Sequence, residues 1–301
     1  MAEFIKNKCP ICRNSSFRII GSPEFGTIDV DKPKESKIVK CKNCKTIYVN
    51  PMPIWTKEDF SKLYNDAEDY FSVVSKSSDL KEKITINRRF KLISQFLKTT
   101  NRNCFEIGAG IHALMAKFLS KNNWNIVVQE PSKAFAAELK KNFLEFNIIE
   151  SDFGDISEEK KYSLIYADSV FEHVHNPGDY IKKSARLLES GGILYFITPN
   201  EYSAFNMVKT FINKLKGGTV SYICPYTISF HLLGFSKKGI KILAEEADLE
   251  IVKLVRGYDY EWRRLLKTKK TILKYPAALL FYIADLLGWG TNQEILLRKL
   301  Q

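Results

Sequence analysis

The chain has no long apolar run. Its longest, residues 276–290, contains Asp285 and falls short of the roughly 20 apolar residues that a membrane-spanning helix needs. The opening residues MAEFIKNKCP also lack the apolar segment found in secretory signals. From these two absences we expect a cytoplasmic protein without a transmembrane helix.

Acidic residues are scarce at both ends of the chain. Residues 1–55 hold ten Lys and Arg against five Asp and Glu, and residues 251–301 hold ten against four, whereas the middle is nearly neutral. A basic excess favours an anionic partner such as a phosphorylated small molecule, a membrane surface or RNA. A lysine-rich solvated surface would give the same count. With 301 residues, 45% of them hydrophobic, the chain can bury a full-size core and an appendage.

Only six cysteines occur, and four of them form two C-x-x-C pairs, Cys9 with Cys12 and Cys41 with Cys44. Each tight turn aims two thiolates at one point, and the intervening loop can bring both pairs onto a tetrahedral Zn²⁺ ion. A cytoplasmic setting disfavours the alternative of disulfides; a ribbon that has lost its metal is the other alternative. Four thiolates close the coordination shell, so the pattern predicts a structural rather than a catalytic zinc.

From residue 103 onward, short apolar segments alternate with amphipathic ones, which predicts an α/β fold with a doubly wound sheet. We expect strands at Cys104–Ile107, Ile126–Gln129, Asn147–Ile149, Ser163–Ala167, Gly192–Thr198, Glu250–Arg256 and Glu294–Lys299. We expect helices at Ala113–Ser120, Lys133–Phe143, Tyr180–Leu188 and Lys237–Ala247. Ligands of such sheets bind beyond the carboxyl ends of the strands, so the chemistry should lie at that edge.

The first three strand ends carry glycines and acids. The segment NCFEIGAGIHAL passes from a strand through Gly108 and Gly110 into a helix, and the N–H groups of such a turn can approach a nucleotide-like ligand. Glu130 ends the second strand, where a carboxylate can accept both hydroxyls of a ribose. Asp152 follows the third strand, where it could meet the exocyclic amine of an adenine. A dinucleotide would also suit the glycines, because Ala113 completes a loose GxGxxG pattern.

The segments FEIGAG, VVQEPS, SDFGDI, YSLIYADSVFEHVHNP and SGGILYFITPN, in this order, resemble the class I S-adenosylmethionine-dependent methyltransferases. The leader CPIC…CKNC…YVNP resembles the zinc-binding segment that precedes many bacterial members, often those acting on sugars or surface-polysaccharide precursors. The resemblance implies a seven-stranded Rossmann-like sheet whose last strand, within NQEILLRKL, is antiparallel. It also implies methyl transfer, and FEHVHNP together with the C-terminal strand favours this over a dinucleotide enzyme.

The resemblance further implies which residues bind S-adenosylmethionine. It places Glu106, Gly108 and Gly110 at the methionine part, Glu130 at the ribose and Asp152 at the adenine. It adds Ala109, Pro131, Phe153 and Asp168 to the cofactor site, with Tyr70 as a further candidate. The family usually continues GxG with another small residue, whereas this chain has Ile111 and His112, so the geometry of the turn is in question.

Transfer to a hydroxyl requires in-line placement and removal of a proton, and the chain has only four histidines. His173 follows the fourth strand and His231 matches the H…FS segment of the family, so both are candidate catalytic bases. The alternatives are that His173 braces its loop and that His231 has a structural or substrate-orienting role. The loop also resembles that of ubiquinone-biosynthesis O-methyltransferases, which hold a divalent ion with Glu-x-x-Glu-His. Ser169 replaces the first acid here, which argues against a catalytic metal.

These patterns divide the chain into four parts: a zinc-binding ribbon over 1–55, a helical connector over 56–100, the S-adenosylmethionine-binding domain over 101–256, and a helical insertion with the last strand over 257–301. Residues 261–290 are basic in their first half and apolar in their second. This pattern suits a lid that meets a phosphorylated or lipid-linked substrate at a membrane surface. A helical cap packed on the domain is the alternative.

The sequence therefore predicts a methyltransferase for a small molecule, most plausibly a sugar, a nucleotide-sugar or another surface-glycan precursor. An RNA methyltransferase that uses the ribbon and the basic ends is the alternative. Against it, the ribbon shows no interleaving of aromatic and basic residues, and no NPPY motif follows the fourth strand. A non-catalytic scaffold is a third possibility, against which Glu130 and Asp152 argue.

Overall fold

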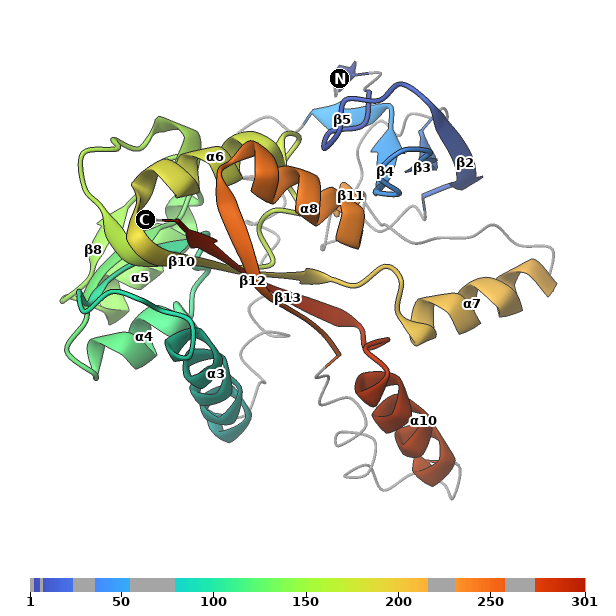
Figure 1. The fold of residues 1–301 in the computed structure, drawn as a ribbon. Coiled ribbons are helices and arrows are strands. Elements are labelled where there is room, and N and C mark those ends of the chain that lie inside the picture. Colours follow the sequence, from blue (N-terminus) through green and yellow to red (C-terminus); the bar gives the residue numbers. More distant parts are fainter. Residues whose placement is uncertain are drawn as a thin grey trace.

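The computed structural model describes residues 3–5, 8–23, 36–54, 79–215, 231–257 and 274–300. The described strands form three sheets. The largest lies at the centre of the molecule, and the smaller ones lie beside it, near the amino terminus (Figure 1). Tyr70 and most of the expected helical connector lie outside the described residues.

The central sheet has seven strands in the order β12-β13-β10-β9-β6-β7-β8. They are β6 (Asn103–Ile107), β7 (Asn125–Gln129), β8 (Asn147–Ile149), β9 (Tyr162–Asp168), β10 (Leu188–Pro199), β12 (Leu249–Arg256) and β13 (Asn292–Lys299). Strand β13 runs antiparallel to both of its neighbours, whereas β10, β9, β6, β7 and β8 pair in parallel. The predicted doubly wound, seven-stranded fold with an antiparallel last strand is confirmed.

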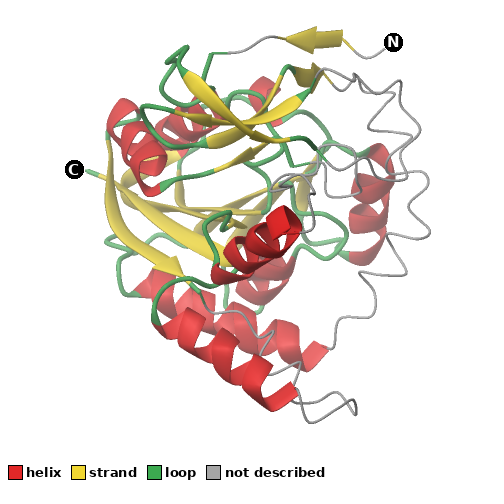
Figure 2. Ribbon diagram, turned by 90° about the vertical axis from the view of Figure 1, so that its right-hand side faces the viewer, coloured by secondary structure: helices red, strands yellow, loops and turns green. Residues whose placement is uncertain are grey.

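Helices cover both faces of this sheet, and Figure 2 shows strands enclosed between helices. The described helices are α3 (Asp79–Ser94), α4 (Leu114–Ser120), α5 (Lys133–Asn142), α6 (Pro177–Leu187), α7 (Ala204–Leu215), α8 (Lys237–Glu246) and α10 (Lys274–Leu286). Of these, α7 and α10 do not cover the sheet but extend away from it (Figure 1). Helix α6 begins three residues before its predicted start, because Pro177 occupies the first turn, where its restricted φ angle and missing N–H suit a helix. Strand β10 begins four residues early and shifts register between Leu188 and Ile193.

Two apolar clusters hold the layers together. On one face, Ile93 of α3 and Leu119 of α4 pack in a cluster with Tyr166 of β9. On the other face, Ile181 of α6 and Leu243 of α8 belong to the cluster that contains the opposite side of the same strands. Because β9 and β10 are buried on both faces, their apolar residues run on almost without interruption, as is typical of central parallel strands.

The amino-terminal segment forms an antiparallel sheet of β2 (Phe17–Gly21), β3 (Lys37–Cys41) and β4 (Ile47–Asn50). Its fourth strand is β11 (Leu233–Gly234), in which Leu233 pairs with Tyr48. Strands β1 (Glu3–Ile5) and β5 (Met52–Ile54) form a separate pair. The ribbon sheet is thus completed by residues far along the chain, and its core is continuous with that of the larger domain.

Candidate functional site

The turn after β6 contains two glycines with left-handed backbone angles, Gly108 at φ +58° and Gly110 at φ +57°. A Cβ atom at Gly108 would lie 2.8 Å from Cγ2 of Val170, in the loop after β9. A Cβ atom at Gly110 would meet nothing within 4 Å. Gly108 is therefore required by a close approach within the protein, whereas the space beside Gly110 is open to a ligand.

Glu130, at the carboxyl end of β7, clamps this turn. Its Oε2 accepts a hydrogen bond of 2.9 Å from the N–H of Gly110, and its Oε1 accepts one of 2.9 Å from the N–H of Ser132. The residue is only 4% exposed, and burial raises the pKa of its carboxyl to about 7. Each carboxylate oxygen retains lone-pair capacity for another donor, so Glu130 can bind a ligand hydroxyl while it holds the turn. Pro131 follows on the exposed surface.

Glu106 lies on the neighbouring strand but has a different partner. Its Oε2 accepts a hydrogen bond of 2.6 Å from the N–H of Ala116, in the first turn of α4. That helix needs a cap, because Ala113 at its N-cap position makes no side-chain hydrogen bond and has φ +38°. Burial raises the pKa of Glu106 to about 8. The structure thus shows Glu106 supporting the helix, and its expected contact with the methionine part stays a prediction.

Gln129 also braces the turn, although the sequence analysis did not select it. Its side chain accepts from the N–H of Gly108 at 3.0 Å and donates to the carbonyl of Ser151 at 2.7 Å. It thereby links the ends of β6, β7 and β8. The signal available in the sequence was an amide at the end of an otherwise apolar strand. The structure buries this amide together with its two partners, as buried polar groups require.

Asp152 and Phe153 follow β8, as expected. Asp152 is exposed and caps the short helix η1 (Phe153–Asp155) by accepting from the N–H of Gly154 at 2.7 Å. The hydroxyl of Tyr180 donates to both of its carboxylate oxygens, at 3.1 and 3.2 Å. The ring of Phe153 is buried against Phe105 and Tyr180. A ligand would therefore meet the backbone rather than the ring of Phe153, and the adenine contact of Asp152 stays a prediction.

Asp168 is held by a charged partner. Arg89 of α3 forms an ion pair of 2.5 Å with its Oδ2, and the hydroxyl of Tyr166 donates to the same oxygen at 3.2 Å. The neighbouring Arg88 pairs with Glu294 of β13. These pairs tie α3 to the sheet. Adjacent arginines in the predicted connector were visible in the sequence, but their carboxylate partners lie 79 and 206 residues away.

The two candidate catalytic histidines meet next to Glu172. His173 and His231 have ring centroids 4.9 Å apart, and Nε2 of His231 lies 4.0 Å from Oε1 of Glu172. The backbone produces this meeting, because the carbonyl of Glu172 accepts from the N–H groups of Leu232 and Leu233, which follow His231. The Glu172 side chain is fully buried, and its oxygens have no hydrogen-bond partner among the described residues.

Glu172, His173 and His231 form a cluster in which burial shifts the pKa values of Glu172 and His231. Burial raises the pKa of Glu172 well above its usual range and lowers that of His231 to about 4. A pKa of about 4 leaves His231 uncharged at neutral pH, with a lone pair that can accept a proton. The three potential ligand atoms also lie within 4.8 Å of one another, a grouping that could hold a divalent cation. Ser169, not a carboxylate, precedes this cluster in the loop.

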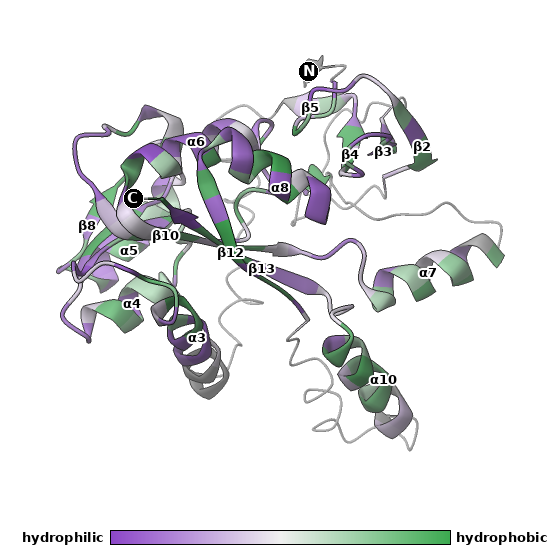
Figure 3. Cartoon of the chain, viewed as in Figure 1, coloured by the Kyte–Doolittle hydropathy of each residue, from purple (hydrophilic) through white to green (hydrophobic). Residues whose placement is uncertain are grey.

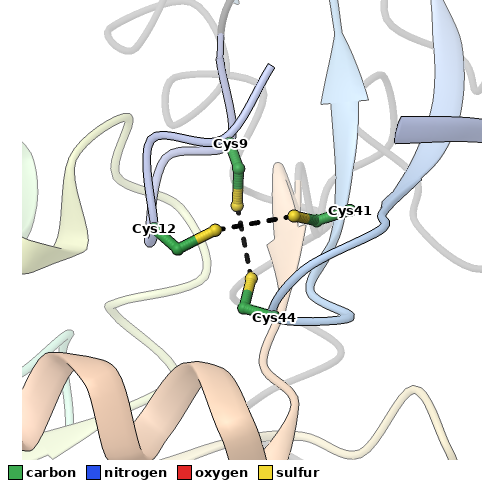
Figure 4. Close-up of side chains that lie close together, drawn as sticks. All are labelled: Cys9, Cys12, Cys41 and Cys44. Carbon is green, nitrogen blue, oxygen red and sulfur yellow. Dashed lines mark hydrogen bonds between the residues drawn. The ribbon is translucent and has the colours of Figure 1, made fainter. Parts of the chain in front are cut away.

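The four cysteines of the ribbon converge on one point (Figure 4). Sulfur atoms of Cys9 and Cys44 lie 3.4 Å apart, and those of Cys12 and Cys41 lie 3.5 Å apart. These separations are too long for disulfide bonds of about 2.05 Å. They approach the roughly 3.8 Å between sulfurs that surround Zn²⁺ tetrahedrally at about 2.3 Å. The donor set therefore fits a closed, structural zinc site.

A surface hollow of about 680 Å³ lies at the opposite edge of the sheet. Asn103, Asn125 and Asn147, the first residues of β6, β7 and β8, contribute to its lining. Ligands of parallel α/β sheets bind at the carboxyl ends of the strands, and the residues described above lie at those ends. The hollow is therefore separate from the candidate site.

Comparisons with known proteins agree with this fold. A family model described as a methyltransferase domain matches residues 81–254. The structure of magnesium protoporphyrin IX methyltransferase from Synechocystis, which contains bound S-adenosylhomocysteine, is similar with a TM-score of 0.54 and 11% identity, covering 81% of this chain and 100% of that one. A comparison with curated proteins found no match.

Two further solved structures are similar to this chain. An S-adenosylmethionine-dependent methyltransferase from Clostridium acetobutylicum has a TM-score of 0.51 and 11% identity, over 79% of this chain and 99% of that one. A methyltransferase of the same dependence from Archaeoglobus fulgidus has a TM-score of 0.50 and 13% identity, over 72% and 94%. At these identities the likeness shows the fold.

Proposed function

Because this chain belongs to the methyltransferase-domain family, we propose that it is an S-adenosylmethionine-dependent methyltransferase for a small molecule, namely a sugar, a nucleotide-sugar or another surface-glycan precursor. When bound, S-adenosylmethionine supplies a methyl group on a positively charged sulfur, which a nucleophile placed in line can take. The observation that carries the proposal is the Glu130 carboxylate, buried and held against the Gly110 turn at the ends of adjacent strands.

The residues at this edge fit the nucleoside. Glu130 uses its oxygens for Gly110 and Ser132 and keeps acceptor capacity for two ribose hydroxyls. Gly110 leaves open space beside the turn, where the amino-acid part would lie. Asp152, oriented by Tyr180, is the acceptor for the adenine amine. Glu106 acts indirectly, by holding α4 and therefore the turn in place.

The cluster of Glu172, His173 and His231 would remove the proton of an acceptor hydroxyl. His231 is the proposed base because its low pKa keeps the imidazole neutral at physiological pH. The carboxyl of Glu172, with Oε1 4.0 Å from Nε2 of His231, is positioned to stabilise the positive charge that forms on the ring. His173 packs against His231 and would orient it.

The acceptor class is supported by sequence features. Ten basic residues against five acidic ones in the first 55 positions suit a phosphorylated substrate, and the leader resembles those of sugar-modifying enzymes. The four cysteines would hold zinc as a structural ion. RNA as the acceptor is an outcome that the experiment below distinguishes.

The first test is titration calorimetry of the zinc-loaded protein with S-adenosylmethionine and S-adenosylhomocysteine. We expect binding of both, loss of binding in Glu130→Ala, and unchanged binding in Glu138→Ala, which alters a surface glutamate of α5. If neither compound produces binding heat, the proposal is wrong.

The second test is a screen with a radiolabelled methyl donor against sugar nucleotides and, in parallel, RNA at low salt. We expect label in the sugar fraction and at least a tenfold loss of rate in His231→Ala, in line with about 10²–10⁴-fold for general-base catalysis. Label in RNA alone would replace the sugar assignment while retaining methyl transfer.

A further inference from the structure

Exposed apolar side chains are concentrated on two helices. Of nineteen large apolar residues that the described part of the chain exposes, fourteen lie on α7, on α10 or in the turn after α10. On α7 they are Phe205, Met207, Val208, Phe211, Ile212 and Leu215. On α10 and its following turn they are Tyr275, Leu279, Leu280, Tyr282, Ile283, Leu286, Leu287 and Trp289. Monomeric proteins rarely leave so large an apolar surface exposed without a use for it.

The exposed residues form one face on each helix. On α7, positions 208, 211, 212 and 215 recur at the i, i+3, i+4, i+7 spacing of an amphipathic helix. On α10, positions 275, 279, 282, 283 and 286 share a face, while Ala278 and Ala284 are buried on the other side. A helix normally turns such a face toward the core, whereas the side chains of these faces are exposed. Figure 3 shows that both helices contain many hydrophobic residues.

Both helices emerge from the carboxyl edge of the sheet, where the candidate site lies. Helix α7 follows β10, and α10 precedes β13, whose Asn292 pairs with Pro199 at the end of β10. The N–H of Ala204 donates to the carbonyl of Trp289 at 2.8 Å, and the rings of Phe205 and Phe281 stack at 6.2 Å. The start of α7 and the end of α10 are therefore held together, and both helices extend away from the domain (Figure 1).

The sequence segments that contain these helices are predominantly basic. Residues 204–216 and 261–290 together contain nine Lys and Arg against two acidic residues, Glu261 and Asp285. Basic residues next to apolar and aromatic ones are the composition of helices that lie in the interface of an anionic bilayer. Tyr and Trp favour that interface as well.

We propose that α7 and α10 form a docking surface for an anionic lipid bilayer, which turns the carboxyl edge of the sheet toward the membrane. Each helix lies on the bilayer, because 12 or 13 residues reach only about 20 Å, less than the roughly 30 Å of the hydrocarbon layer. None of the described helices is long and apolar enough to cross a membrane.

A second copy of the chain is the competing occupant. In a symmetric dimer the same surface meets itself, so two copies of segments with an excess of basic residues would be brought together. That repulsion favours the lipid surface. Docking does not depend on the proposed methyl transfer, because vesicle binding is measured without a methyl donor or acceptor.

The experiment is co-sedimentation of the full-length, zinc-loaded protein with vesicles of phosphatidylcholine containing roughly 30 mol% phosphatidylglycerol, and with phosphatidylcholine alone. We expect preferential binding to the anionic vesicles and weaker binding when NaCl rises from about 0.1 to about 0.5 M. The variant Leu215→Asp/Leu286→Asp changes side chains that are 73% and 69% exposed. It should lower partitioning at least about tenfold. Leu144→Asp, at a site 88% exposed elsewhere, should bind like the wild type.

A second measurement uses the unaltered apolar faces. Brominated lipids should quench the fluorescence of Trp289. The Trp289→Phe variant is the control, because it should lack the fluorescence that these lipids quench in the wild type. No binding to anionic vesicles, equal binding to neutral ones, or full binding by the double variant would overturn the proposal. Dimerisation in ultracentrifugation that the double variant abolishes, without vesicle binding, would assign the surface to a second copy instead.

Discussion

Glu106 and Glu130 occupy similar positions: both lie at the ends of adjacent strands of one sheet, and they are 3% and 4% exposed. Burial raises the pKa of both, to about 8 and about 7. Yet Glu106 accepts from the first turn of α4, inside the core, whereas Glu130 accepts from the turn that borders open space. A buried carboxylate therefore marks a binding site only when its remaining lone pairs face a place that a ligand can occupy.

The largest expected effect is on ligand affinity, and it distinguishes the binding role of Glu130 from the structural role of Glu106. Glu130→Ala removes the proposed acceptor of two ribose hydroxyls, each hydrogen bond to a charged acceptor being worth about 1.5–3 kcal/mol. Affinity for S-adenosylhomocysteine should fall about a hundredfold or more in calorimetry. An affinity within threefold of the wild type would show that Glu130 only clamps the turn.

The complementary variant, Glu106→Ala, should act on stability. It leaves the first turn of α4 without its acceptor and opens a cavity in the core, at a cost of about 2–4 kcal/mol in the free energy of unfolding. Urea unfolding at constant pH measures this loss. If Glu106→Ala unfolds like the wild type but no longer binds S-adenosylhomocysteine, Glu106 has a binding role and not a structural one.

Glu106→Gln should keep the hydrogen bond to Ala116 and remove the titration. The wild-type carboxyl has a folded-state pKa of about 8 against an ordinary value of 4.5, so between these values the folded state holds more protons than the unfolded state. Wild-type stability should consequently fall as pH rises through this window. Relative to the wild type, the glutamine variant should gain roughly 3 kcal/mol in the free energy of unfolding between pH 5 and pH 8, as urea titrations at both pH values can test. A constant difference would exclude the titration of Glu106 as the cause.

The smallest effect concerns the pH dependence of binding. Because the pKa of Glu130 is raised to about 7, lowering the pH through this value protonates the carboxyl and removes acceptor capacity for the ribose. Affinity for S-adenosylhomocysteine should fall by at most about tenfold per pH unit below 7. Glu130→Gln, by contrast, should bind weakly and without this dependence. The same slope in both proteins would assign the titration to another group.

Much of the fold followed from local patterns. The strands around Phe105 and Ile165 are apolar runs between amphipathic helices, and this alternation is readable along the chain. The C-x-x-C spacing likewise predicted that four sulfur atoms converge, and the structure brings them together. The docking of β11 on β4 was not predicted, because a two-residue strand carries no periodicity and pairs with residues almost two hundred positions away.

Part of the candidate site could likewise be predicted from the sequence, and part of it could not. Glycines and acids at strand ends could be located from the sequence, since a parallel sheet gathers its carboxyl ends at one edge. The bracing by Gln129 and the pairing of Arg89 with Asp168 could not, because each depends on partners brought together only by the fold. The meeting of His173 with His231 was also uncertain until the backbone contacts of Glu172 placed them side by side.

By itself, the sequence determined the order of strands and helices, the cysteine pairs and the motif positions, because these depend on short-range spacing and residue chemistry. Only the tertiary structure decided which buried carboxylate holds a helix and which faces a binding space. It also decided that the apolar faces of α7 and α10 remain outside the core. The physical reason is that burial, and with it pKa, depends on neighbours distant in the chain.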